Sequence, residues 1–525
     1  MNGTQGEVME KPLSQIVIVG GGTAGWLAAC AIAARAQPVA PPISVTLVES
    51  PDVPTIGVGE GTWPSIRATL KRIGIAEADF LQSCDGSFKQ GTRFDGWSTG
   101  GAQDRYYHPF TRPDEIAPRD LVAAWEREAS RLPFAHVVSP QPHICAAGLA
   151  PRQLAMADYV GVLNYAYHLD AGKFAELLLR NAVGRLGVRH VRDHVVAVER
   201  AEDGDIKALR TRSSGLIEGE LFLDCTGHAG LLIGKELAVE WIDRSHVLFN
   251  DRALATQVPV AAGSPIAAQT NATAHRAGWI WDIGLPNRRG VGCVYASEYC
   301  DDEAAAEILR AYLRRTAQGA DGSEAVSFRR LTFDAGHRAR FWERNCVAIG
   351  LSAGFVEPLE ASAIVMIEFS LLQLLDHWPA TRSAMPSHAR RFNELFQFRW
   401  ERIVEFLKLH YVLSRRDEPY WRAHRDSASI PPRLAELLEI WRYQPPSLAD
   451  LPTANEMFPS PSYQYVLYGM NFAAPPASPF HASRQGSPGV IDEVEKRVRQ
   501  LAPHLPTNRA YLDALCARKT EMARP

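Results

Sequence analysis

Short apolar runs separated by glycine-rich turns open the chain. Residues 16–19 form a β-type apolar run, residues 20–25 are rich in glycine, and residues 26–34 have the apolar spacing of a helix. A second apolar run at 43–48 ends at Glu49. This order of strand, turn, helix and strand predicts one mononucleotide-binding unit of a Rossmann-like α/β fold.

The pattern changes further along the chain. Residues 174–186 have helical spacing, residues 188–223 alternate in short β-type runs, and the apolar run 346–350 leads into a helix from about 362 to 377. Beyond residue 390 the pattern is mostly helical, at 390–414, 432–442, 491–502 and 508–518. Two segments rich in glycine, proline or serine, 51–64 and 473–489, are predicted to be loops.

The first glycine-rich turn has the spacing that a dinucleotide site needs. Gly20 permits a tight turn, Gly22 allows the backbone to approach a pyrophosphate, and Gly25 lets the helix pack against the strand. The amides that open the helix, Thr23 and Ala24 among them, would meet the phosphates at the positive end of the helix dipole. Such a turn also occurs in unrelated α/β folds, but here the strand and the helix that the motif requires are both present.

Glu49 indicates which dinucleotide binds. It lies 24 residues beyond Gly25 at a strand end, where a carboxylate accepts the ribose hydroxyls and disfavours a 2′-phosphate. This predicts FAD or NAD rather than NADP. A second close turn at 224–227 favours FAD, which is long enough to cross the sheet.

Composition argues against several classes of protein. The 525 residues include 56 basic and 59 acidic side chains, a net charge of −3, which a broadly basic nucleic-acid-binding protein would not have. A run of about 18 apolar residues is absent, and the N-terminal segment lacks the pattern of a signal peptide. The eight cysteines are scattered without a C-x-x-C pair, which favours reduced thiols over disulfides or a zinc site. We therefore expect a cytoplasmic protein without a membrane, nucleic-acid or metal partner.

Seven segments resemble, in the same order, those of the flavin-dependent tryptophan halogenases. They are GGGTAGW at 20–26, GVGEGTWPSI at 57–66, SFKQGTRFDGW at 87–97, DCTGHAGLLI at 224–233, NDRALATQVP at 250–259, GWIWDIGLP at 278–286 and GLSAGFVEPLEASAI at 350–364. Each segment is only moderately specific. Their shared order, within a similarity that runs from about residue 14 to 470, identifies the chain as a member of this family.

The resemblance implies a fold and a reaction. The expected fold is an α/β, flavin-monooxygenase-like FAD-binding module (14–255 with 325–375) joined to a largely helical substrate-binding module (256–324 and 376–525). The family uses FADH2 from a separate flavin reductase, oxygen, and chloride or bromide to make hypohalous acid. This acid halogenates an electron-rich arene. A homodimer is compatible with this organisation.

Two residues match the family's catalytic pair. Lys89 matches the lysine that hydrogen-bonds hypohalous acid or forms a haloamine with it, and Glu360 matches the carboxylate that stabilises the cationic intermediate or takes its proton. The simpler interpretation of Lys89 is a solvated surface lysine, against which its apolar neighbours Phe88, Phe94 and Trp97 argue. The simpler interpretation of Glu360 is an acid favoured by the dipole at a helix start.

Further site residues follow from the same resemblance. The halide maps to the backbone amides of Ser362 and Ala363, where this chain has Ala-Ser-Ala in place of the usual Ser-Thr-Gly. Leu351 and Ile364 map to contacts near the flavin ring, and Val195 maps to a contact at the adenine end.

Aromatic residues match the family's substrate site. His108 and Phe110 match the rings that sandwich the arene, whereas His190 and His194 are interpreted as structural. The segment 279–284 matches the family's W-x-W-x-I-P motif except that it ends in glycine. In the family this motif is thought to prevent monooxygenase activity at the flavin, so the departure leaves room for a variant activity.

The stretch at 444–462 departs from family members that take free tryptophan. Those enzymes clamp the amino-acid end of tryptophan with a Tyr-Tyr pair and a Glu, and this stretch lacks the set. Burying a zwitterion without partners is costly, so we expect indoles, other electron-rich arenes or a peptide-borne aromatic side chain as substrates. The rival hypotheses are a flavin-dependent aromatic monooxygenase and a FAD-binding protein without halogenating activity. An NAD-dependent dehydrogenase has only the glycine motif in its favour.

Overall fold

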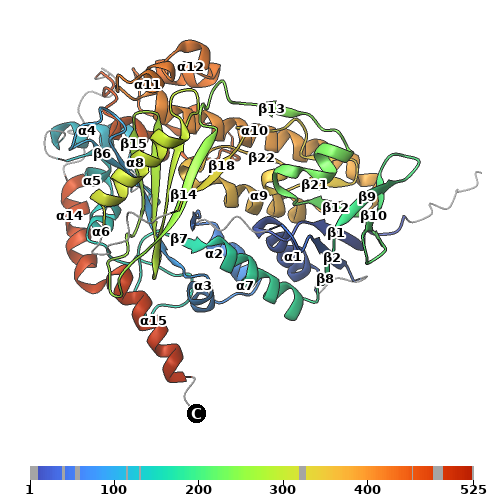
Figure 1. The fold of residues 1–525 in the computed structure, drawn as a ribbon. Helices are drawn as coiled ribbons and strands as arrows, with labels where there is room; N and C mark the ends of the chain where they lie inside the picture. The colour runs from blue at the N-terminus through green and yellow to red at the C-terminus, as the bar shows by residue number, and fades with distance from the viewer. Residues whose placement is uncertain are drawn as a thin grey trace, which may run out of the picture.

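Two sheets of different kinds organise the fold and lie on opposite sides of the molecule in Figure 1. The structure is a computed structural model that describes residues 10–37, 42–53, 59–113, 116–128, 132–317, 327–451, 453–476 and 489–522. The predicted strand–turn–helix–strand unit is present as β1 (Gln15–Val19), α1 (Thr23–Ala36) and β2 (Ser44–Glu49). The α/β prediction is confirmed. Parts of the loops predicted at 51–64 and 473–489 lie outside the described residues.

The first sheet is mainly parallel and carries the dinucleotide-binding unit. Its six strands run in the order β20-β21-β12-β1-β2-β8, with β8 at Arg189–Arg192, β12 at Leu221–Asp224, β20 at Trp342–Glu343 and β21 at Cys346–Ala348. All neighbouring pairs are parallel except β20 with β21. Because the carboxyl ends of β1, β2 and β12 meet at one edge, Gly20, Glu49 and Cys225 come together there.

The second sheet is mainly antiparallel and joins distant segments. Its order is β18-β14-β17-β16-β15-β5-β6, with β5 Gly91–Asp95, β6 Arg105–Pro109, β14 Arg252–Pro259, β15 Thr270–His275, β16 Gly278–Gly284, β17 Arg288–Tyr295 and β18 Arg329–Thr332. Residues 256–317 thus supply strands and one helix, α8 (Asp302–Arg315), whereas the helical part of the expected substrate module begins at α10 (Met385–Val412). The division into two modules at the expected boundaries stays a prediction.

Three small sheets and the remaining helices complete the fold. The sheets are β3-β7-β4 (Gly59–Gly61, Ala166–Asp170, Ser87–Lys89), β11-β10-β9 (Leu216–Glu218, Ile206–Thr211, Val195–Arg200) and β13-β19-β22 (Trp241–Asp243, Gly336–Arg338, Gly354–Phe355). The helices predicted from the sequence pattern are observed as α7 (Ala171–Gly184), α9 (Ser362–Asp376), α10, α12 (Pro432–Ile440), α14 (Val490–Leu501) and α15 (Asn508–Met522). The others are α2 (Ile66–Arg72), α3 (Glu77–Ser83), α4 (Pro118–Glu128), α5 (Phe134–Val138), α6 (Gln141–Ala146), α11 (Pro419–Ala423) and α13 (Ser460–Gly469).

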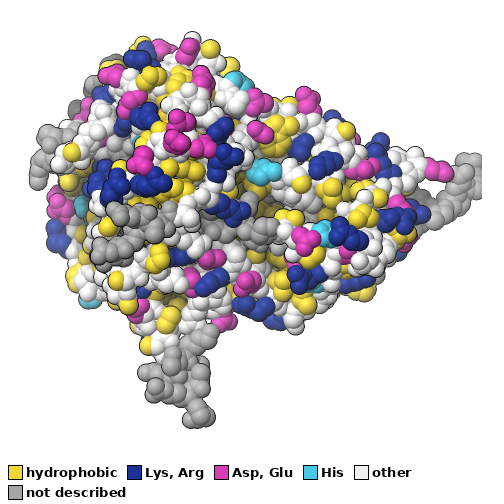
Figure 2. All heavy atoms as spheres, in the orientation of Figure 1, with side chains coloured by type: hydrophobic (Ala, Val, Ile, Leu, Met, Phe, Trp, Pro, Cys, Tyr) yellow, Lys and Arg dark blue, Asp and Glu magenta, His cyan; other side chains and the backbone are white. Residues whose placement is uncertain are grey.

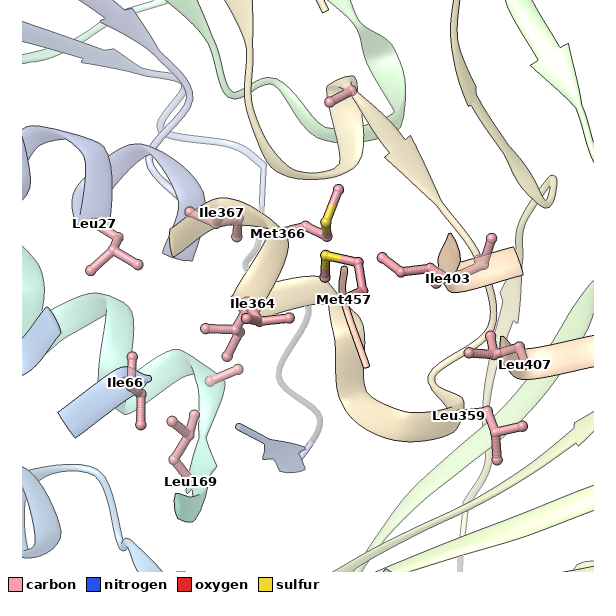
Figure 3. Packing of buried hydrophobic residues seen from close by; sticks show 14 of the residues in the cluster. Leu27, Ile66, Leu169, Leu359, Ile364, Met366, Ile367, Ile403, Leu407 and Met457 are labelled. Carbon is pink, nitrogen blue, oxygen red and sulfur yellow. The ribbon is translucent and has the colours of Figure 1, made fainter. Parts of the chain in front are cut away.

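The start of α9 is packed into the main core. Figure 3 shows its apolar side chains against those of α1, α2, β7 and the segment before α13, among them Leu27, Ile66, Leu169, Ile364, Met366 and Met457. All six are buried. Burying one such side chain contributes about 1.5–3 kcal/mol, so the core holds α9, and the turn that precedes it, in a defined place.

The surface is mixed in charge. Basic and acidic side chains are interspersed over the face shown in Figure 2, in keeping with the small net charge. Each helix in the described part of the chain is too short or too polar to cross a membrane. Seven of the eight cysteines are buried, and these seven carry free thiols, as their scattered spacing predicted.

Candidate active site

The glycine-rich turn after β1 has the geometry of a phosphate-binding turn. Gly20 has φ +113°, and a Cβ at this position would lie 2.2 Å from the carbonyl oxygen of Cys225. A Cβ on Gly25 would lie 1.8 Å from the carbonyl oxygen of Gly20. A Cβ on Gly22, by contrast, would meet no atom of the described chain within 4 Å. The backbone at Gly22 therefore borders open space, which fits the pyrophosphate of FAD.

Helix α1 presents its first amides to this space. The helix begins at Thr23 and continues through Ala24, and no side chain caps its N-terminus. The first amides of a helix have no partner within it, so those of Thr23 and Ala24 are suited to a phosphate at the positive end of the helix dipole.

Glu49 lies at the carboxyl end of β2, beside the turn. A Cβ on Gly21 would lie 1.6 Å from Oε2 of Glu49, so carboxylate and turn are in direct contact. The other oxygen, Oε1, lies 3.1 Å from Nε2 of His190. His190, interpreted from the sequence as structural, therefore also contacts the carboxylate expected to bind the ribose. His194 faces Asp52 instead, at 2.8 Å.

Replacing Gly22 by alanine is expected to weaken FAD binding without unfolding the protein. Gly22 has φ −80°, which alanine adopts readily, and its Cβ would meet no described atom, so Tm should change by no more than about 2 °C. The added methyl group would occupy the space proposed for the pyrophosphate. A flavin-fluorescence titration should show binding weakened at least about tenfold.

Gly25→Ala is the matched contrast, because its Cβ would collide with the backbone of Gly20. We expect this variant to have a lower Tm as well as weaker FAD binding. Wild-type FAD affinity in Gly22→Ala would contradict the assignment of the turn to the pyrophosphate.

The other residues expected near FAD lie on different elements. Leu351 is in a 3₁₀ turn (Gly350–Ser352), Val195 opens β9, and both are half-buried. Ile364 is 2% exposed and packs in the main core, so a contact with FAD would come from its backbone. The assignment of these three residues to FAD stays a prediction.

Lys89 ends β4 and is buried, with 2% of its surface exposed. The interpretation of Lys89 as a solvated surface lysine is therefore wrong. Its Nζ lies 5.3 Å from the centre of the Phe110 ring. A Cβ on Gly61 would lie 3.0 Å from this Nζ and 3.5 Å from the Cβ of Ala361, which places the ammonium beside the turn before α9. Burial lowers the pKa of Lys89 to about 8, against the opposing attraction of Glu360.

Glu360 lies in that turn, in a strained conformation. Glu360 and Ala361 have φ values of +62° and +55°, left-handed conformations that cost a non-glycine residue about 1–2 kcal/mol each. Such strain persists where surrounding contacts fix it. Here the carbonyl oxygen of Glu360 accepts a 2.6 Å hydrogen bond from the indole of Trp63.

The Glu360 carboxylate contacts two histidines. Its Oε1 lies 2.8 Å from Nδ1 of His108 and 3.1 Å from Nε2 of His410. Burial alone would raise the pKa of Glu360, but the attraction and hydrogen bonds of His108 and His410 lower it well below its usual range. Glu360 is therefore an ionised carboxylate in a buried site.

Ser362 and Ala363, the residues expected to hold the halide, open α9. Their amides have no acceptor within the helix and lie at the positive end of a 15-residue helix. Ser362 is buried and Ala363 is exposed. The arrangement suits a backbone anion site close to the Lys89 ammonium, and halide binding there stays a prediction.

His108 and Phe110, expected to sandwich the arene, border the same space. His108 lies on β6, with Nε2 2.9 Å from the hydroxyl of Ser462 on α13. Phe110 follows β6 directly and faces Lys89. A stacked aromatic pair contributes about 0.5–1.5 kcal/mol beyond burial, so these rings can orient an arene by its plane.

Four residues of this site were not predicted from the sequence: Trp63, His410, Phe458 and Ser462. The Phe458 ring stacks on Phe406 with centroids 3.7 Å apart and meets Trp63 edge-on at 5.0 Å. Phe458 and Ser462 belong to the stretch 444–462, for which only the missing Tyr-Tyr pair and Glu entered the sequence-based prediction. His410 is a single histidine in a helical pattern, so only the three-dimensional contact with Glu360 distinguishes it.

A second buried glutamate ties this turn to the rest of the site. Glu357 accepts hydrogen bonds from the indole of Trp279 (2.8 Å), the hydroxyl of Tyr411 (2.6 Å) and the side-chain amide of Asn250 (2.5 Å). These donors come from β16, α10 and the segment before β14. The W-x-W-x-I strand thus contacts the turn that carries the catalytic candidate, and both of its tryptophans are buried.

Comparison with known proteins decides the family. The family model described as "Tryptophan halogenase" matches residues 15–485. The chain belongs to the tryptophan halogenase family. It is 34% identical to the 7-chloro-L-tryptophan 6-halogenase KtzR of Kutzneria sp. (strain 744), over 95% of this chain and 98% of that protein.

Solved structures agree with this assignment. The tryptophan halogenase of Shewanella frigidimarina NCIMB 400 has a TM-score of 0.91 at 45% identity, covering 97% of this chain and 98% of that one. BrvH, a flavin-dependent halogenase from Brevundimonas sp. BAL3, has a TM-score of 0.84 at 30% identity, with 96% and 99% covered. As a member of the family, this protein is a flavin-dependent halogenase, an oxidoreductase that halogenates an aromatic substrate with FADH2.

Proposed function

We propose that this halogenase chlorinates or brominates an electron-rich arene, an indole derivative rather than free tryptophan, with Lys89 and Glu360 as catalytic residues. The observation that carries the proposal is a buried ammonium and a buried, ionised carboxylate beside one turn at the start of α9. Phe110 beside the Lys89 ammonium and His108 beside the carboxylate give that turn an aromatic border.

The cofactor would bind at the glycine-rich turn after β1. When bound, FADH2 would react with oxygen, and the oxidant so produced would convert halide to hypohalous acid. Gly22 and the first amides of α1, in the turn that Gly20 and Gly25 make possible, would hold the cofactor's pyrophosphate, and Glu49 would hold its ribose. We infer that a separate flavin reductase provides the FADH2. A cytoplasmic location and a homodimer stay predictions.

Lys89 is suited to activate hypohalous acid. With a pKa of about 8, it is mainly an ammonium at neutral pH and can donate a hydrogen bond to the oxygen of the acid, which makes the halogen more electrophilic. The neutral amine is also accessible close to pH 8 and could form a haloamine. Both forms place the reactive halogen beside Phe110.

Glu360 is suited to the second half of the reaction. When the ring carbon attacks, the carbon–halogen bond forms, the oxygen–halogen bond breaks, and the oxygen leaves as water with a proton from Lys89. The ring is then a cation, which an ionised carboxylate stabilises electrostatically. Glu360 accepts the ring proton and so restores aromaticity.

The stretch at 444–462 supports a substrate without an amino-acid end. Its two acidic side chains are engaged within the protein. Asp450 accepts hydrogen bonds from the backbone of Ser447 and the side chain of Gln444, and Glu456 pairs with Arg433 at 3.4 Å. Asp450 and Oε1 of Glu456 therefore already have partners, and a substrate ammonium would have to compete with them, whereas Oε2 of Glu456 is buried without a hydrogen-bond partner among the described residues.

Indole is expected to be a better substrate than free tryptophan. Leaving the charges of the tryptophan zwitterion without matched partners in a buried site costs free energy, so kcat/KM for indole should exceed that for tryptophan at least about tenfold, or 1.4 kcal/mol in transition-state stabilisation. The measurement is a competition assay with both substrates in one reaction. N-acetyltryptophanamide is the matched probe, because it keeps the ring and backbone of tryptophan but lacks both charges. Equal kcat/KM for indole and tryptophan would contradict this substrate class.

A further inference from the structure

His410 has an unusual pair of hydrogen-bond partners. It lies on α10 and is fully buried. Its Nδ1 lies 3.0 Å from the carbonyl oxygen of Phe406, and its Nε2 lies 3.1 Å from Oε1 of Glu360. A carbonyl and a carboxylate only accept hydrogen bonds. Both ring nitrogens must therefore donate, which makes the ring an imidazolium facing a carboxylate.

The second histidine on Glu360 does not need this charge. His108 donates from Nδ1 to Glu360, but its Nε2 lies against the hydroxyl of Ser462, which can donate to it. A neutral ring therefore satisfies His108. The two histidines on one carboxylate thus differ: both stabilise the ionised form of Glu360, but only the partners of His410 require its ring to be charged.

Aromatic rings enclose His410 on several sides. The ring centroids of Phe94, Phe406 and Trp97 lie 5.0, 5.3 and 6.0 Å from that of His410. Aromatic faces attract a cation, and more strongly where water is excluded. This environment suits an imidazolium. Among the described residues, Glu360 is the one charged side chain paired with His410.

We propose that His410 is a positioning residue, an imidazolium that orients the Glu360 carboxylate and helps to keep it ionised, so that Glu360 can take the ring proton. This inference rests on the proposed role of Glu360. It adds to the Lys89–Glu360 pair a third charged group that does not touch the substrate.

The titratable groups that face Glu360 define the expected pH effect. They are Lys89 from β4, Tyr106 and His108 from β6, and His410 from α10. Without the His410 charge, the contacts of His108 would be left to oppose the effect of burial, and the pKa of Glu360 would rise. Since Glu360 must be ionised to accept the proton, activity would be lost at low pH and regained as the pH increases. The acid limb of the pH–rate profile should move up by about 1–3 units.

The test uses the full-length protein with pre-reduced FAD, bromide and indole in single turnovers, so that the reductase does not contribute to the pH profile. His410→Gln keeps a donor toward Glu360 without the charge, and His410→Asn keeps only the donor toward Phe406. We expect both variants to show the shifted acid limb with unchanged FAD affinity. His424→Gln is the control, because His424 is equally buried but contacts Lys408 instead. Its acid limb should stay at the wild-type position.

Two results would overturn the inference in distinguishable ways. A wild-type acid limb in both folded His410 variants, together with an inactive Glu360→Gln, would remove His410 from the mechanism and leave the proposed function intact. Wild-type halogenation by Glu360→Gln would overturn the proposed role of Glu360, and the inference with it.

Discussion

Replacing Lys89 by alanine is expected to abolish halogenation while FAD binding and oxygen consumption continue. The ammonium is buried beside Phe110 and the turn before α9, where no other described lysine or arginine is positioned to replace it. Loss of one positioned proton donor lowers a rate by about 10²–10⁴-fold. Oxidising equivalents that no longer reach the arene should appear as hydrogen peroxide. The measurement is the ratio of halogenated product to peroxide for each FADH2 consumed.

Lys173→Ala is the control for this experiment. Lys173 lies on the neighbouring α7, is 44% exposed and pairs with Asp85 at 2.6 Å, so its loss should leave the product ratio unchanged. If Lys89→Ala produced halogenated indole at the wild-type rate, Lys89 would have no place in the mechanism.

Replacing Glu360 by glutamine is expected to slow halogenation by about 10²–10³-fold, or 2.7–4 kcal/mol. Glutamine preserves the size of the side chain but can neither stabilise the ring cation by charge nor accept its proton. The effect should fall on kcat rather than KM, because the charge develops only after the substrate is bound. Steady-state kinetics with a fixed supply of FADH2 would measure it.

Glu368→Gln, on the helix α9 that follows the Glu360 turn, is the matched control. Burial raises the pKa of Glu368 to about 7, against the hydrogen bonds that it accepts from Ser65 and Thr69. At neutral pH this carboxyl is therefore partly protonated already, and the amide resembles its neutral form. A loss in Glu368→Gln as large as that in Glu360→Gln would show that any buried glutamate in or just before α9 is needed for folding, and the catalytic assignment would lose its support.

The sequence predicted the parts of the fold that are local. The unit β1–α1–β2 consists of contiguous segments whose apolar spacing reports strand or helix directly. The helices α9, α10, α12, α14 and α15 were predicted for the same reason. The seven-stranded sheet was not predicted, because its pairings join distant segments: β5 lies beside β15, and β14 lies beside β18. Apolar spacing within one segment carries no information about its partner.

The candidate site shows the same division between local and distant information. Lys89 and Glu360 were found because each lies in a motif. The burial of Lys89, however, depends on the pairing of β4 with β7, and of β7 with β3, which joins segments that are distant in the sequence. His410 was missed because a histidine on the apolar face of a helix is ordinarily a core residue. Its role depends on the left-handed conformation of Glu360, which brings the carboxylate against α10 and which the sequence pattern does not report.

The most direct test of the account is mass spectrometry of indole after incubation with the protein, FAD, a flavin reductase, NADH, oxygen and either chloride or bromide. We predict a monohalogenated product, recognisable by the isotope pattern of the halogen, that is absent when the halide is omitted and when Lys89→Ala replaces the wild type. An indole product that gains oxygen instead of halogen, formed regardless of halide, would contradict the account and favour a flavin-dependent monooxygenase.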